Sequence, residues 1–147
     1  MSRSAAVERS SALEELSGYW TSELGTEFDP RIAERMNSHG KLVVSSSLTS
    51  VVWGESPISL VTVGGLAEYL RSDGPDVAVC GSSTLTATLL QAGIVDELRL
   101  IVNPIILGGG LKLFEGSGTV PLELTRSRPF TSGNVLLYYR PLKPSIE

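Results

Sequence analysis

The chain has one cysteine, Cys80, and one histidine, His39, among its 147 residues. A single cysteine excludes an intramolecular disulfide and favours a reducing compartment, so we expect a cytoplasmic protein. One histidine and one cysteine cannot build a zinc site or a convincing Ser-His-acid triad, so no metal ion is expected and no catalytic residue can be named. No apolar run reaches the roughly 18 residues of a membrane span, and the N-terminus lacks the apolar core of a signal peptide.

Basic residues are scarce as well. The chain holds 12 Lys or Arg against 16 Asp or Glu, a net charge of −4, and the basic positions are scattered along the sequence. This balance gives no reason to expect nucleic acid as a partner. An anionic cofactor remains possible, because backbone amides at a helix N-terminus attract phosphate without net positive charge.

The remaining sequence is typical of one globular α/β domain spanning residues 1–147, with residues 1–10 poorly ordered. Helices are predicted over 11–19, 29–37, 66–72 and 83–92. Strands are predicted over 41–45, 51–53, 58–63, 77–80, 97–102, 122–127 and 135–140. We expect residues 20–28 to form a loop, and we expect His39 to cap the end of the helix that Asp29 and Pro30 begin.

The strongest local signal lies where an apolar strand, Val77–Cys80, runs into Gly81, Ser82, Ser83, Thr84 and Leu85. The strand is apolar without alternation, as expected of a strand covered on both faces. Gly81 permits close approach of a ligand to the backbone, and the following hydroxyls begin a helix with free amides, an arrangement that holds pyrophosphate in several folds. The alternative, that these hydroxyls only cap the helix, stays open.

Two further segments could contact a ligand. Ser45, Ser46, Ser47 and Leu48 end the strand at 41–45, a position where ligands of open α/β folds bind, although a polar turn is the simpler explanation of these residues. The segment 103–110 ends in three consecutive glycines, which indicates either close contact with a ligand or a flexible connection.

In this order, the segments resemble the dihydrofolate reductase-like family that includes the C-terminal reductase domain of the riboflavin-biosynthesis deaminase-reductase. The likeness rests on five ordered stretches and a closing one, at residues 16–20, 35–45, 79–85, 93–98, 104–114 and 133–141. It implies a three-layer mixed sheet flanked by helices and an NADPH-dependent oxidoreductase that transfers hydride to a pterin- or pyrimidine-like small molecule, often as a homodimer. It also implies that Gly81–Leu85 holds the pyrophosphate and Ser45–Leu48 the adenosine with its 2′-phosphate.

The chain departs from the family's pattern at three places. Nothing before Ser10 is expected to supply the family's N-terminal strand, so that strand should be missing or replaced. Arg9 lacks the glycine that usually precedes it, and Ser46 stands where many relatives have an arginine for the 2′-phosphate, so NADH is possible as well as NADPH. Two other classes therefore stay open: a non-catalytic nucleotide-binding or dimerisation module, and a scaffold repurposed for another small-molecule reaction.

Overall fold

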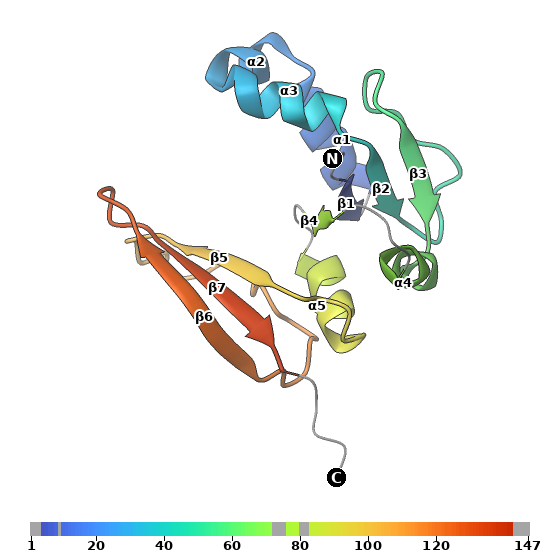
Figure 1. Cartoon of the computed structure of the whole chain (residues 1–147). Coiled ribbons are helices and arrows are strands. Elements are labelled where there is room, and N and C mark those ends of the chain that lie inside the picture. The colour runs from blue at the N-terminus through green and yellow to red at the C-terminus, as the bar shows by residue number, and fades with distance from the viewer. Residues whose placement is uncertain (1–3, 9, 72–75, 80–82, 143–147) are drawn as a thin grey trace. The chain divides into compact units, whose positions relative to one another are not determined.

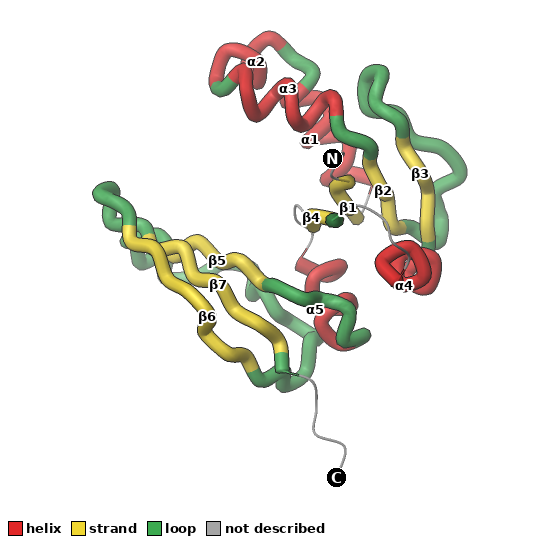
Figure 2. Tube along the Cα trace, viewed as in Figure 1, coloured by secondary structure: helices red, strands yellow, loops and turns green. Residues whose placement is uncertain are grey.

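The computed structural model describes residues 4–8, 10–71, 76–79 and 83–142 (Figures 1 and 2). These residues form two compact units, Met1–Leu85 and Thr86–Glu147, which are described separately below. Unit 1 contains β1 (Ser4–Glu8), α1 (Ser10–Trp20), α2 (Glu23–Phe28), α3 (Pro30–Ser38), β2 (Lys41–Val44), β3 (Ile58–Val61), α4 (Val63–Arg71) and β4 (Val77–Val79). Unit 2 contains most of α5 (Ser83–Gln91), then β5 (Leu98–Val102), β6 (Leu122–Pro129) and β7 (Val135–Pro141).

The strands of unit 1 form one parallel sheet in the order β3-β2-β1-β4. β1 pairs with β2 from Ala5↔Lys41 to Glu8↔Val44, and on its other side it pairs with β4. The prediction that residues before Ser10 supply no strand is therefore wrong. Residues 4–8 are too short and too weakly apolar to give a strand signal, but partners on both sides satisfy their backbone hydrogen bonds.

The predicted loop over 20–28 is also wrong in its second half, which forms the short helix α2. Ser22 caps this helix, because its Oγ accepts a hydrogen bond from the backbone N–H of Gly25 at 3.3 Å. Gly25 is buried, and a β-carbon there would collide with the carbonyl oxygen of Tyr19. The glycine that lets α2 pack against α1 is thus the residue that weakens the helical signal in the sequence.

Three further predictions for unit 1 need correction. Val51–Trp53 is irregular rather than a strand, because Trp53 is drawn into the core with 1% of its surface exposed. α4 begins at Val63, before the predicted start at Leu66, because Thr62 caps it. β4 is an edge strand whose Ala78 and Val79 are exposed, so it is not covered on both faces.

Predictions based on capping residues are confirmed. Asp29 caps α3 through its Oδ1, which accepts hydrogen bonds from Arg31 N at 3.0 Å and Ile32 N at 3.2 Å. His39 is the C-cap of the same helix, and its backbone N–H donates to the carbonyl of Arg35. Unit 1 then closes its core around Leu13, Val43 and Trp53.

A polar network joins α3 to this core at the amino end of β2. Asn37 donates from Nδ2 to the carbonyl of Trp20 at 2.7 Å and accepts from the indole N–H of Trp53 at 2.9 Å. Lys41, only 3% exposed, donates from Nζ to the carbonyl of His39 at 2.9 Å and to Ser56 Oγ at 3.2 Å. The same ammonium group lies 4.5 Å from the ring centroid of Trp53.

Unit 2 holds a three-stranded antiparallel sheet in the order β5-β7-β6, and β6 and β7 are the two strands predicted over 122–127 and 135–140. The β6–β7 turn uses Gly133, whose φ of +85° favours glycine. α5 ends at Gln91, just before Gly93 with φ +65°, as predicted. Ala87, Leu89 and Leu90 of α5 and Leu98 of β5 are the buried hydrophobic residues of this unit among those described.

Among the described residues, no helix is both long and apolar enough to cross a membrane.

The Asn37 network yields a first prediction. Asn37→Ala leaves the indole N–H of the buried Trp53 without its acceptor, so we expect the free energy of unfolding to fall by about 2 kcal/mol. Asn134→Ala is the matched control, because its side chain makes one exposed hydrogen bond, to Asn103. Chemical denaturation of both variants measures the difference. Equal small losses would show that the network does not stabilise the fold.

Burial lowers the pKa of Lys41 below its ordinary value of 10.5, because desolvation penalises the charged ammonium. Between the lowered folded-state pKa and 10.5, the unfolded chain binds more protons at this site than the folded chain, so stability rises with pH there. We therefore expect the stability of the wild type relative to Lys41→Met to increase as pH rises towards 10.5. A stability difference between the wild type and Lys41→Met that stays flat over this pH range would contradict the prediction.

Candidate functional site

The carboxyl ends of the strands in unit 1 lie along one edge of the sheet, because every pairing is parallel. Glu8 pairs with Val44, and Val44 pairs with Val61, so the chain leaves β1, β2 and β3 at the same level. β4 runs in the same direction beside β1, with Val79 opposite Ala6. The segments that follow these strands therefore meet at this edge, which we call the carboxyl edge.

The first segment at the carboxyl edge is the predicted one, Ser45–Leu48. Ser45 continues the pairing, since its N–H donates to the carbonyl of Val61 at 3.0 Å. Its Oγ accepts hydrogen bonds from Ser47 N at 3.2 Å and Leu48 N at 3.1 Å, which closes a tight turn. Ser45 thus has the structural role that the polar-turn alternative gave it, while the exposed Ser46 and Ser47 are presented to solvent.

The second segment, Thr62–Gly65, was not identified from the sequence. Thr62 Oγ1 accepts a hydrogen bond from Gly65 N at 3.1 Å, and the Thr62 carbonyl accepts one from Leu66 N at 2.9 Å, so α4 starts at once after β3. A β-carbon on Gly64 would meet only Thr62 Oγ1, at 3.8 Å, so the backbone here is open to close approach. The signal was available, because a strand followed by a hydroxyl residue, two glycines and a leucine contains the same residue types as the stretch at 81–85, although in another order.

The third segment is the start of α5. Ser83 is half-buried, Thr84 is exposed, and Leu85 is fully buried and fixes the first turn in the core. The predicted Gly81 and Ser82, like Cys80, lie outside the described residues. The structure thus places Ser83–Leu85 in the same unit as Ser45–Leu48, at the end of the neighbouring part of the sheet.

The electrostatics of this edge favour an anion. The N-termini of α4 and α5 both follow parallel strands, and neither helix has an acidic residue in its first turn. The partial positive charge of each helix N-terminus is therefore not neutralised from within the helix. Oriented amides, open glycine backbone and exposed serine hydroxyls are the donor set that holds phosphate groups.

The glycine-rich segment 103–110 belongs to unit 2, whereas Ser45–Leu48 and Ser83–Leu85 belong to unit 1. Ile105, Ile106 and Leu107 are 65%, 97% and 77% exposed. Gly108 and Gly110 have φ of +70° and +135°, so this loop depends on glycine for its path.

No group of three or more potential metal ligands occurs among the described residues. The perturbed cation Lys41 starts β2 and lies at the opposite, amino end of the sheet. The arrangement at the carboxyl edge therefore consists of hydrogen-bond donors and helix termini, which suit binding and orientation of a ligand that brings its own chemistry.

Known proteins share this fold. The chain is similar to a putative riboflavin biosynthesis protein from Shewanella sp. PV-4, with a TM-score of 0.70 and 19% identity over 95% of this chain and 74% of that one. It is also similar to a pyrimidine reductase-like protein from Corynebacterium diphtheriae, with a TM-score of 0.54 and 15% identity over 97% and 76% of the two chains. The riboflavin biosynthesis reductase Rib7 of Saccharomyces cerevisiae gives 0.51 and 14% over 97% and 88%. These structures share the fold of this chain, which is the dihydrofolate reductase-like α/β fold that the sequence predicts.

The sequence comparison is more specific. The family described as the RibD C-terminal domain matches residues 26–136, so the chain belongs to this family. The uncharacterized protein YyaP of Bacillus subtilis (strain 168) is 34% identical over 70 residues, which are 47% of this chain and 37% of that protein. The matched part of the chain thus spans little more than a third of that relative's length.

Proposed function

We propose that the carboxyl edge of unit 1 binds a nicotinamide dinucleotide and that the chain is an NAD(P)H-dependent reductase acting on a pterin- or pyrimidine-like small molecule. The observation that carries the proposal is the convergence of Ser45–Leu48, Thr62–Gly65 and the start of α5 at one edge of a parallel sheet. Membership of the RibD C-terminal domain family supports a reductase-type activity for this edge.

Each segment has a distinct task in this proposal. The start of α5 at Ser83 and Thr84, with Gly81 and Ser82 before it in the sequence, would hold the pyrophosphate at the positive end of the helix dipole. The turn that Ser45 closes would present Ser46 and Ser47 to the adenosine end. Thr62–Gly65 lies between these segments in chain order, and its open glycines would admit the dinucleotide close to the backbone.

When bound, the nicotinamide ring would supply the hydride, and the chain would supply binding and orientation. The residues fit such a ligand. The N-termini of α4 and α5 have no acidic residue in their first turns, so their partial positive charge attracts a dianionic pyrophosphate. Ser46 offers a hydroxyl and no positive charge to a 2′-phosphate. Discrimination between NADPH and NADH should therefore be weak, because no charge-assisted hydrogen bond is available from this position.

Titration with NADPH and with NADH, followed by nicotinamide fluorescence, tests binding directly. We expect dissociation constants on the order of micromolar for both nucleotides and loss of binding in Gly81→Leu, since a side chain there would block the phosphate. If neither NADPH nor NADH binds at millimolar concentration, the proposal is contradicted. Binding without hydride transfer to a panel of pterins and aminopyrimidines would favour the non-catalytic module instead.

The role of the serine turn gives a second, sharper experiment. Ser46→Arg places a guanidinium at the carboxyl edge, so we expect the affinity for NADPH relative to NADH to rise by about tenfold. Ser38→Arg is the matched control, because this exposed serine precedes β2 at the opposite end of the sheet. Equal ratios in the two variants would show that the turn does not contact the 2′ position.

A further inference from the structure

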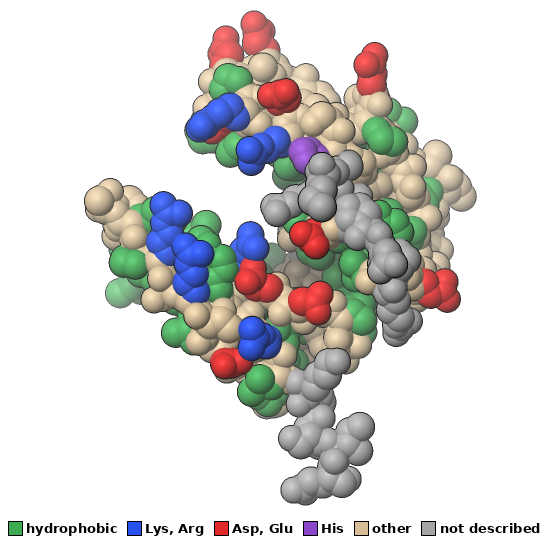
Figure 3. Space-filling view, in the orientation of Figure 1, with side chains coloured by type: hydrophobic (Ala, Val, Ile, Leu, Met, Phe, Trp, Pro, Cys, Tyr) green, Lys and Arg blue, Asp and Glu red, His purple; other side chains and the backbone are tan. Residues whose placement is uncertain are grey.

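The sheet of unit 2 carries arginines on one face of its strand β6. Cross-strand register places Arg126 beside Tyr138 of β7, and Arg128 follows two residues later on β6. Residues two apart on a strand point to the same face, so both arginines lie on one side of the sheet. Figure 3 shows basic side chains gathered over β6. We call Arg126 and Arg128 the arginine pair.

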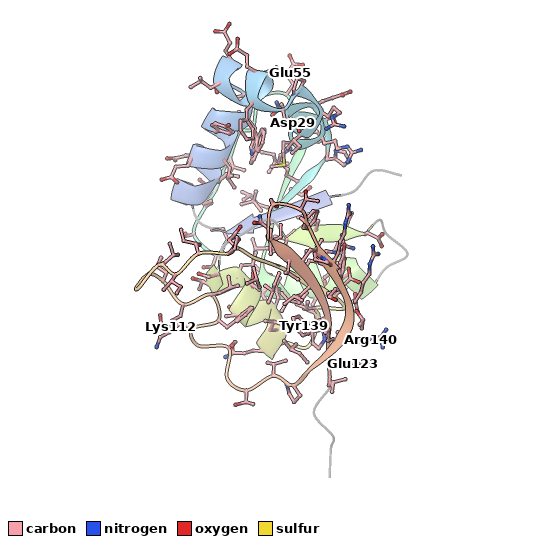
Figure 4. All side chains as sticks on the ribbon, turned by 90° about the vertical axis from the view of Figure 1, so that its left-hand side faces the viewer. Asp29, Glu55, Lys112, Glu123, Tyr139 and Arg140 are labelled. Carbon is pink, nitrogen blue, oxygen red and sulfur yellow. The ribbon has the colours of Figure 1, made fainter. Side chains whose placement is uncertain are left out.

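The charge of the arginine pair is not compensated, unlike that of its neighbours. Arg99 of β5 pairs with Glu97 at 2.5 Å, and Arg140 of β7 pairs with Glu123 of β6 at 3.1 Å, as the labelled side chains in Figure 4 show. Among the residues that the structure describes, neither member of the arginine pair has a carboxylate partner. Two positive charges on β6 are therefore available to a ligand.

Aromatic rings position both guanidinium groups of the pair. Arg126 lies 5.0 Å from the ring centroid of Tyr138, and Arg128 lies 4.8 Å from that of Phe130. Such cation–π contacts restrict the side chains and leave their N–H donors free for carboxylate oxygens. The arginine pair is thus ordered before a ligand arrives, which lowers the entropic cost of binding one.

The same strand has an open edge. β6 is the last strand in the order β5-β7-β6, and all of its residues are exposed. The N–H of Phe130 donates to the carbonyl of Asn134 at 2.8 Å, which fixes the phase of the antiparallel ladder. Alternate residues before Phe130, Arg128 and Arg126, therefore bond to β7. Ser127 between them directs its backbone N–H and C=O away from the sheet.

An extended peptide segment can add to this edge as a further strand. Backbone hydrogen bonds with Ser127 would hold it, and its alternate side chains would lie on the same face as the arginine pair. Residues two apart on either strand are separated by about 6.6 Å, so the two spacings match. Acidic side chains two residues apart would each meet one guanidinium group, with which a carboxylate forms strong hydrogen bonds.

The charge of the β6 edge also selects against other occupants. Like charges directly opposite one another destabilise a pair of strands, so a second β6 edge, which would set arginine against arginine, is disfavoured. The net charge of −4 on the whole chain disfavours nucleic acid. An acidic extended segment is the occupant that satisfies both the open backbone and the two charges.

We propose that the β6 edge binds an extended acidic segment of a partner protein. The segment adds as a strand at Ser127 and sets two acidic side chains, two residues apart, on the arginine pair. This inference does not rest on the proposed reductase activity, because none of its residues belongs to the carboxyl edge. It involves unit 2 alone.

Fluorescence anisotropy of the full chain with two labelled peptides, TVEVEVT and TVKVKVT, tests the charge requirement. We expect the glutamate peptide to bind the wild type at least about tenfold more tightly than the lysine peptide. Arg126→Glu/Arg128→Glu should reverse this preference, because the edge then carries the opposite charge. Lys112→Glu, an exposed charge reversal in unit 2 outside β6, should preserve it, and circular dichroism verifies that each variant is folded.

A second pair of variants tests strand addition. Pro129 has no N–H, so Ser127 supplies the outward donor of this stretch. Ser127→Pro removes that donor without removing a hydrogen bond to β7, whereas Ser127→Ala keeps it. We expect Ser127→Pro to bind the glutamate peptide at least about fivefold more weakly than Ser127→Ala does. Equal affinities of the two variants would exclude addition at this edge.

Other outcomes would also overturn the proposal. If the glutamate peptide does not bind at millimolar concentration, or if the wild type binds both peptides equally well, the arginine pair does not select an acidic strand. If a single-stranded oligonucleotide binds more tightly than the glutamate peptide, and Arg126→Glu/Arg128→Glu abolishes that binding, the arginine pair recognises nucleic acid instead.

Discussion

The parallel pairing of β1 with its two neighbours is the constraint on which the candidate site depends. β1 lies inside the sheet, between β2 and β4, so its direction sets the direction of the strands on both sides. Because all pairs are parallel, the turn at Ser45, the cap at Thr62 and the start of α5 come to one edge although they lie far apart in the sequence. If β1 paired antiparallel with β4 alone, the start of α5 would leave from the opposite end of the sheet. A five-residue strand of small side chains thus determines where the donors for a dinucleotide can meet.

The two ends of this sheet are built differently. At the amino end, Asn37, Lys41 and Ser56 tie α3 and the loop around Trp53 into a closed hydrogen-bonded network with little exposed surface. At the carboxyl edge, the exposed Ser46 and Ser47 and the open backbone at Gly64 leave donors facing solvent. The amino end of the sheet thus stabilises the fold, and the carboxyl edge is open to a ligand. This division is usual in α/β folds, where ligands bind outside the carboxyl ends of the strands.

Local chemistry made part of this predictable from the sequence. Asp29 before Pro30, Gly93 after α5 and Gly133 between β6 and β7 are signals that act over a few residues, and each element they bound is where the sequence placed it. The strand at 4–8 and the burial of Lys41 depend on partners distant in the chain, so no local pattern predicts them. In α2 the buried Gly25 weakens the helical signal. The grouping of Arg99, Arg126 and Arg128 on one face of the unit 2 sheet is the same kind of case, because only the register of three strands brings them together.

Hydrogen exchange measured by mass spectrometry, with and without saturating NADPH, tests the central claim most directly, because it reports where the nucleotide binds independently of any activity. The account predicts slower amide exchange in three separate stretches, 45–48, 62–66 and 81–86, with little change around Asn37 and Lys41 at the opposite end of the sheet. Protection confined to unit 2, or no protection at any of the three stretches, would contradict a dinucleotide site at the carboxyl edge.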